Sequence, residues 1–273
     1  MDTLKFLTAE EKASYDNNGF IKLSGIFTDT ELKTISNEYN DLFERKNADD
    51  QGGLEAAWVG ERMKREAGYI DYTVKAVHNL QMHSAVFTKV ITHSKLLDAV
   101  EDVMGTENIL LHHTKAHIKP PENGAPYLMH QDYSYFPFKN HTMLAVFLHL
   151  DDTTPENGGL AVYPGSHKLG PLEDKGLTDK NGEQYHYVDQ DKFPLSGATP
   201  VSAKKGEIII FSYLLLHGSY LNRSNRPRRM FLIQLRAAED EPTELCHQSP
   251  AQNLVLRGKN KYRAASMATR FNP

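Results

Sequence analysis

The sequence has a single cysteine, Cys246, among its 273 residues. One thiol excludes a disulfide within the chain and is in keeping with a reducing compartment. No apolar run approaches the roughly 20 residues that a membrane-spanning helix needs, and the first residues lack the pattern of a secretory signal. We therefore expect a cytoplasmic protein without a membrane partner.

A basic bias is absent as well. The sequence has 31 Lys and Arg residues against 35 Asp and Glu, a net charge of −4 and a pI near 6.4, which argues against nucleic acid as a partner. It contains no internal repeat and no low-complexity tract. A hydrophobic content of 40% with 24% charged residues is typical of a globular chain that can bury a core. We interpret residues 1–273 as one domain, and nothing in the sequence indicates an oligomeric state.

The pattern of apolar residues predicts a mainly helical first part over residues 1–108. Thr8-x-x-Glu11 and Thr28-x-x-Glu31 are capping-box patterns that begin helices, and they lie on either side of a strand predicted within residues 19–27. Apolar residues recur at helical spacing from Leu96 to Met104, and Gly105 after them is a predicted C-cap.

From residue 109 onward the pattern is that of short strands, and it predicts a β core over residues 109–240 followed by a C-terminal extension over 241–273. The predicted strands are 109–118, 143–150, 160–163, 207–215 and 229–236. Residues 171–200 form a polar, turn-rich insertion that contains aromatic residues. They are either an unstructured surface insertion or a lid that excludes water from an active site.

Two short motifs carry the chemistry, His130-Gln131-Asp132 and His217-Gly218-Ser219. Two imidazoles and one carboxylate are the ligand set of a non-haem Fe(II) site, which leaves open positions for a bidentate keto acid and O2. On an extended segment His130 and Asp132 face the same way. We therefore predict His130, Asp132 and His217 as the catalytic metal ligands.

The residues on either side of the second motif predict an arginine that binds an anion near the metal. The apolar run 208–216 indicates a buried strand that delivers His217 at its edge, and polar residues 222–227 indicate a hairpin turn into a strand that starts at Arg228. Such a hairpin returns an arginine to the neighbourhood of His217, where a guanidinium can bind the distal carboxylate of 2-oxoglutarate. Arg228 and Arg229 have opposite strand parity, so only one of the two can face the iron.

Further motifs, in the same order along the chain, make the sequence resemble the phytanoyl-CoA dioxygenase family over most of its length. These motifs are Asn18-Gly19-Phe20-Ile21, His113-Thr114, Lys119-Pro120-Pro121, Tyr135-Phe136-Pro137-Phe138, Asn157-Gly158-Gly159-Leu160 and Pro164-Gly165-Ser166-His167-Lys168, together with the two ligand motifs, Asn222 and Arg228. The resemblance implies an iron- and 2-oxoglutarate-dependent oxygenase. The implied fold is mainly β with flanking α-helices, around a double-stranded β-helix (jelly roll, cupin-like) core.

The resemblance also implies roles for individual residues. Arg228 and Ser219 would bind the co-substrate carboxylate. Lys75, Lys115 and Phe147 fall at or near positions that line the co-substrate pocket, although Phe147 stands where a tryptophan is expected and the spacing between Lys75 and His113 differs from that of the acyl-CoA branch.

The function we expect is hydroxylation of a small or medium organic substrate, either acyl-CoA-like or a natural-product intermediate. The reaction would use Fe(2+), 2-oxoglutarate and O2, with ascorbate as a candidate reductant, and would release succinate and CO2. Two alternatives stay open: a catalytically silent metal- and 2-oxoglutarate-binding protein of the same fold, and a cupin-type enzyme that does not use 2-oxoglutarate. His113 and His117 share one strand face, and we interpret them as pocket lining in preference to a second metal site.

Overall fold

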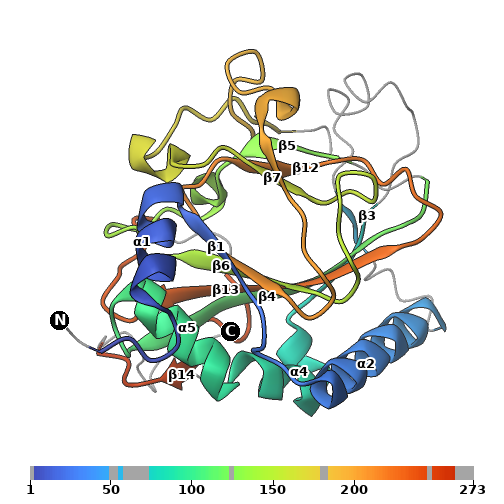
Figure 1. Ribbon diagram of the computed structural model, residues 1–273, viewed down its shortest axis with the longest axis horizontal. Coiled ribbons are helices and arrows are strands. Elements are labelled where there is room, and N and C mark those ends of the chain that lie inside the picture. Colours follow the sequence, from blue (N-terminus) through green and yellow to red (C-terminus); the bar gives the residue numbers. More distant parts are fainter. Residues whose placement is uncertain are drawn as a thin grey trace.

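Two curled antiparallel sheets face each other, and helices cover the outer side of the larger sheet (Figure 1). The computed structural model describes residues 3–48, 55–57, 74–122, 126–178, 184–244 and 248–261. Cys246 lies outside the described residues. No helix in the described part of the chain is long and apolar enough to cross a membrane.

The larger sheet has the strand order β1-β11-β6-β13-β4-β3-β2, with β14 also paired to β4. The bounds are β1 Phe20–Leu23, β2 Glu55–Ala57, β3 Val74–His78, β4 Ile109–Lys119, β6 Leu144–His149, β11 Ile208–Ser212, β13 Arg228–Ala237 and β14 Val255–Arg257.

The smaller sheet has the order β10-β7-β12-β5. Its strands are β5 Tyr127–His130, β7 Leu160–Val162, β10 Thr199–Val201 and β12 His217–Ser219. From β4 to β7 and again from β10 to β13 the chain alternates between the two sheets, and every pairing is antiparallel. This alternation is the double-stranded β-helix that the family resemblance implied.

Four α-helices precede the β core in the described part of the chain; the capping patterns predicted the first two, and the apolar spacing predicted the last. They are α1 Ala9–Asn18, α2 Asp29–Ala48, α4 Ala85–Ile91 and α5 Ser94–Met104. Thr8 and Glu11 form the complete capping box of α1. The Thr28 hydroxyl accepts a hydrogen bond from the Glu31 N–H, while the Glu31 carboxylate accepts one from the Thr28 N–H. Gly105 ends α5 in the left-handed conformation with a φ of 75°.

Side chains of the larger sheet alternate between two cores. Ala116, Val146 and Phe231 point outward and pack with the helices in the main hydrophobic cluster. Their sequence neighbours point inward, so that Phe147 and Leu232 join a second cluster that includes residues of the smaller sheet. Because residues paired across antiparallel strands share a face, the strand register determines which side chains enter the space between the sheets.

Two details of the predicted strands were wrong. β11 ends at Ser212, and His217 begins β12 in the other sheet, so the apolar run is not one strand. β12 and β13 also do not form a hairpin, because they lie in different sheets. The physical reason is that the connecting residues stay buried during the crossing: Leu215 packs in the cluster between the sheets and Leu216 in a cluster beyond the smaller sheet. The sequence therefore stays apolar through the turn between β11 and β12, which conceals the end of β11.

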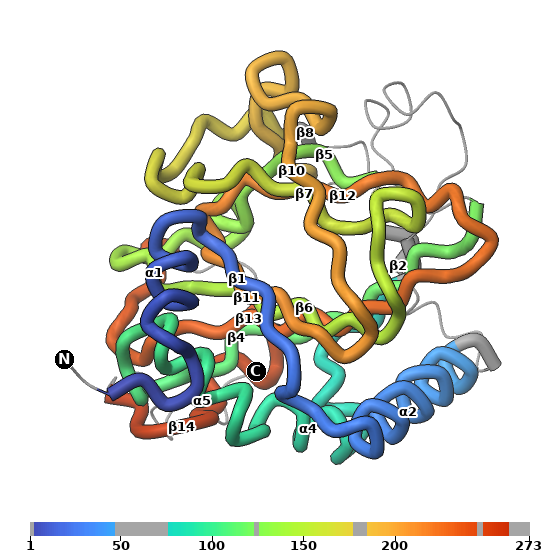
Figure 2. The backbone as a smooth tube through the Cα atoms, in the orientation of Figure 1, coloured from blue at the N-terminus to red at the C-terminus, as the bar shows by residue number. Residues whose placement is uncertain are grey.

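The segment 171–200 packs beyond the smaller sheet (Figure 2). Its described residues include the short pair β8 Leu177–Thr178 and β9 Gln184–Tyr185, and the 3-10 turn η4 Leu195–Gly197. The Gln190 amide bonds both the N–H and the carbonyl of Met129 in β5, at 3.2 and 3.0 Å. These contacts dock the segment on the strand that carries the first predicted metal ligand.

Candidate active site

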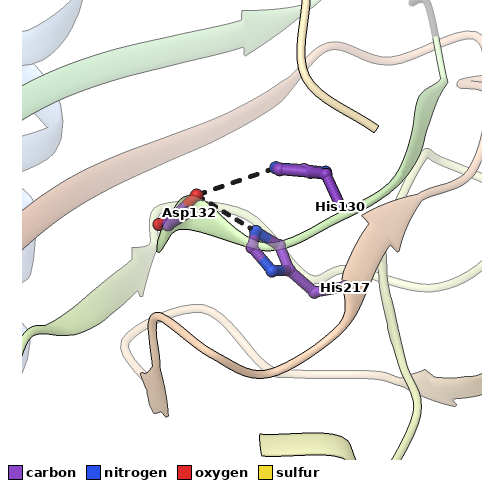
Figure 3. A group of neighbouring side chains, drawn as sticks. All are labelled: His130, Asp132 and His217. Carbon is purple, nitrogen blue, oxygen red and sulfur yellow. Dashed lines mark ion pairs between the residues drawn. The ribbon is translucent and has the colours of Figure 1, made fainter. Parts of the chain in front are cut away.

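His130, Asp132 and His217 point toward one another beside the paired strands β5 and β12 (Figure 3). His130 ends β5, Asp132 opens the 3-10 turn η2 Asp132–Tyr135, and His217 opens β12 directly opposite His130. The Asp132 Oδ1 atom lies 3.7 Å from His130 Nε2 and 3.6 Å from His217 Nε2. Within the described residues, this is the one group of three or more candidate ligands whose donor atoms all lie within 4.8 Å of one another.

Both histidines are held in the tautomer that can bind a metal ion through Nε2. Nδ1 of His130 donates to the Leu128 carbonyl at 2.8 Å, and Nδ1 of His217 donates to the Leu215 carbonyl at 2.9 Å. A neutral ring with its proton on Nδ1 presents a lone pair at Nε2, the atom directed at Asp132. Burial and the neighbouring His217 lower the pKa of His130 well below its ordinary value, which keeps that ring neutral. The donor set and its protonation therefore fit a divalent cation such as Fe(II).

Gln234 orients the carboxylate. This buried residue of β13 donates from Nε2 to Asp132 Oδ2 at 3.0 Å, which leaves Oδ1 directed at the two imidazoles. The sequence reasoning missed Gln234. The available signal was parity, since Gln234 is six residues after Arg228 in the same strand and therefore shares its inward face.

Arg228 points inward and Arg229 outward: strand parity predicted opposite faces, and the family resemblance selected Arg228 as the inward residue. Arg228 is 4% exposed, and its Nη2 donates to the Gly158 carbonyl at 3.0 Å. Burial lowers the pKa of its guanidinium to about 10. Arg229 instead pairs with Asp151 on the outer face, with Nη2 2.6 Å from Oδ1 and Nε 3.0 Å from Oδ2. Arg228 opens β13 of the larger sheet and His217 opens β12 of the smaller one, so no hairpin joins the two residues.

Several of the motifs that carry the family resemblance meet around Arg228. Ser219 ends β12, and its Oγ accepts a hydrogen bond from Lys119 Nζ at 2.6 Å. Lys119 is the cross-strand partner of Arg228. The Asn222 amide donates to the carbonyls of Lys119 and Pro120, at 3.2 and 2.9 Å. Motifs that are far apart in the sequence thus form one buried cluster.

The structure describes the other predicted pocket residues to different extents. Lys115 and Phe147 flank Leu232 in one cross-strand row, on the face that looks toward the smaller sheet. Phe147 is half-buried, with its ring centroid 4.8 Å from that of Phe211. Lys75 pairs through its backbone with Ile118, while its side chain lies outside the described part of the structure. The roles of all three stay predictions.

Aromatic and ionisable residues from the 171–200 segment approach the histidines. The Tyr135 ring centroid lies 6.3 Å from that of His130 and 4.3 Å from that of His186. His186 Nδ1 in turn lies 2.5 Å from Asp174 Oδ2. The predicted insertion therefore supplies His186, which contacts Tyr135, itself a neighbour of the candidate ligand His130.

The other histidines of β4 make separate contacts. His113 Nε2 lies 2.8 Å from His78 Nδ1, and His117 Nδ1 lies 3.3 Å from the Tyr127 hydroxyl. Burial and nearby cations, Lys115 first among them, lower the pKa of His117 well below its ordinary value.

Comparison with known proteins agrees with this geometry. The sequence pattern that describes the phytanoyl-CoA dioxygenase family (PhyH) matches residues 15–230. The chain belongs to this family. It is 26% identical over 260 residues to a probable alpha-ketoglutarate-dependent hypophosphite dioxygenase of Stutzerimonas stutzeri, covering 92% of this chain and 87% of that protein. It is 27% identical over 240 residues to human peroxisomal phytanoyl-CoA dioxygenase, covering 85% and 69%.

A solved structure shows the same fold. The iron-bound crystal structure of EctD from S. alaskensis superimposes with a TM-score of 0.72 at 19% identity, covering 95% of this chain and 90% of that one. Membership of the family makes the protein an Fe(II)- and 2-oxoglutarate-dependent dioxygenase that uses O2 and acts on a small molecule.

Proposed function

We propose that His130, Asp132 and His217 bind Fe(II) and that the protein hydroxylates a small or medium organic substrate, with release of succinate and CO2. The observation that carries the proposal is the convergence of three buried donors in which hydrogen bonds fix both imidazole tautomers and the carboxylate. Iron bound there would activate O2 with the electrons that 2-oxoglutarate releases on decarboxylation.

Arg228 and Ser219 bind the distal carboxylate of 2-oxoglutarate in this proposal. The guanidinium is buried, and a charge-assisted hydrogen bond is stronger there than at the surface. Lys115 and Phe147 line the adjacent row of the same sheet face. Their positions suit contacts along the carbon chain of the co-substrate.

The 171–200 segment acts as a lid in the same proposal. Its His186, which is bonded to Asp174, lies beside Tyr135, and Tyr135 lies beside His130, so closure of this segment would exclude water from the reacting centre. The relatives named for hypophosphite and for phytanoyl-CoA act on very different molecules. We propose an organic substrate, acyl-CoA-like or a natural-product intermediate, and a cytoplasmic location.

Succinate release tests the assignment. Alanine at His130, Asp132 or His217 should abolish 2-oxoglutarate-dependent succinate formation while circular dichroism and the melting temperature show a retained fold. Wild-type turnover with stoichiometric iron in Asp132→Ala would refute the ligand set. The same assay separates an active enzyme from a silent binding protein, and omission of 2-oxoglutarate separates it from a cupin-type enzyme that does not need this keto acid.

A further inference from the structure

Tyr135 is an oxidisable phenol beside the candidate metal ligands, and the proposed function so far gives its ring no part in the chemistry. It ends the η2 turn that Asp132 opens, and its ring meets the His130 ring edge to face at a centroid distance of 6.3 Å. Burial, followed by the charge of Asp132, raises the pKa of Tyr135 well above its ordinary value. The phenol is therefore neutral, and its hydroxyl lies close enough to Asp132 for the charge of that carboxylate to act on it.

Contacts from the 171–200 segment hold the same ring. The His186 ring packs edge-on against the Tyr135 ring at a centroid distance of 4.3 Å, and His186 Nδ1 lies 2.5 Å from Asp174 Oδ2. Asp174 Oδ1 in turn accepts a hydrogen bond from the Gly176 N–H at 2.9 Å. The phenol ring therefore contacts both a candidate metal ligand and the segment that we propose as the lid.

Two other aromatic rings approach the ligands but differ from Tyr135. The Tyr127 ring lies 6.5 Å from that of the same histidine, but Lys119 Nζ lies 5.3 Å from its centroid, so it belongs to the cluster around the proposed co-substrate site. The Phe211 ring lies 4.7 Å from that of His217, but it lacks the hydroxyl group that makes a phenol ring easy to oxidise. Tyr135 differs from both, because it is a phenol on the side of the ligands that the 171–200 segment approaches.

We propose that Tyr135 is a modification site: turnover in the absence of the organic substrate hydroxylates its ring and converts it to a catechol. This inference rests on the proposed function, because that reaction supplies the oxidant. 2-Oxoglutarate loses CO2 and takes one oxygen atom of O2 to become succinate. The other oxygen atom enters a ring C–H bond beside the phenol hydroxyl, and the hydrogen of that bond stays as the proton of the new hydroxyl group. An organic substrate bound in the closed site receives this oxygen atom in place of Tyr135.

Peptide mass spectrometry of the full-length protein tests the proposal. The protein is incubated with Fe(II), 2-oxoglutarate and isotope-labelled O2 without an organic substrate, and is then digested with trypsin. The tryptic peptide of residues 116–139 contains Tyr135 together with three internal controls, Tyr127, Met129 and Tyr133. The peptide should gain the mass of one labelled oxygen atom, and fragmentation should place that atom on Tyr135.

Tyr133 is the matched control, because it lies in the same turn while its ring packs against those of Tyr213 and His141, at 5.6 and 5.7 Å. It should stay unlabelled. Omission of 2-oxoglutarate should abolish the label on Tyr135, and so should Asp132→Ala, which removes a proposed metal ligand.

Each other outcome decides the question. If succinate is released but Tyr135 carries no labelled oxygen, this inference is overturned and the proposed function stands. If neither succinate nor the label appears, both are overturned. A label on Tyr127 or Tyr133 in place of Tyr135 would overturn the inference, and so would a label that forms without 2-oxoglutarate. Labelled oxygen on Met129 alone would show oxidation of a thioether and would overturn it as well.

Discussion

Replacement of Gln234 by leucine should weaken metal binding without unfolding the protein. The Gln234 amide donates the hydrogen bond that holds Asp132 Oδ2, and both side chains are buried. Loss of a hydrogen bond to a charged group costs about 1.5–3 kcal/mol, which corresponds to a roughly 10- to 150-fold weaker affinity if the loss falls on the metal-bound state. Outer-shell partners of metal ligands typically contribute about 10- to 100-fold, so the two magnitudes agree.

The assay is an anaerobic titration of the full-length protein with Co(II) in competition with a chelator, paired with thermal unfolding. Gln190→Leu is the matched control, because it removes a buried amide that bonds only the backbone at Met129 and Val188 in the described structure. It should lower the melting temperature with little change in metal affinity. Wild-type affinity in Gln234→Leu, or an equal loss in Gln190→Leu, would refute the idea that Gln234 acts by orienting Asp132.

Three further outcomes are expected. Arg228→Ala should weaken 2-oxoglutarate binding by about 1.5–3 kcal/mol. Arg229→Ala, which loses an ion pair with Asp151 on the outer face, should change that affinity far less. A larger loss of affinity in Arg229→Ala, measured by calorimetry, would contradict the role of Arg228 as the inward, co-substrate-binding arginine. Burial lowers the pKa of His149 to about 3, so at pH 5 this imidazole is protonated in the unfolded chain but not in the folded protein. His149 therefore makes the protein about 2 kcal/mol less stable at pH 5 than at pH 7. His149→Gln should flatten this pH dependence of the free energy of unfolding, measured with denaturant. Replacing residues 174–186 by a Gly-Ser linker should uncouple 2-oxoglutarate consumption from product formation, and a preserved one-to-one ratio of succinate to product would rule out a lid.

Features encoded by neighbouring residues could be predicted from the sequence. The capping boxes at Thr8 and Thr28 depend on side chains three residues apart, and the C-cap at Gly105 depends on one residue that tolerates the left-handed conformation. The placing of Arg228 and Arg229 on opposite faces follows from alternation along one strand. The local pattern was sufficient in each of these cases.

Features that depend on contacts between distant segments could not be predicted in the same way. The end of β11 at Ser212 is hidden because the crossing residues stay apolar for burial in two different clusters. The hydrogen bond from Gln234 to Asp132 and the one from Lys119 to Ser219 join residues about a hundred positions apart. Neither pair shares a sequence motif, so only the register between strands brings these side chains together.

The most direct test of the metal site is a crystal structure of the protein with Mn(II) and 2-oxoglutarate. We predict one metal ion bound by His130 Nε2, Asp132 Oδ1 and His217 Nε2, chelated by the keto acid end of 2-oxoglutarate, with the distal carboxylate against Arg228. A metal ion bound by other side chains, or a co-substrate carboxylate directed away from Arg228, would contradict the account.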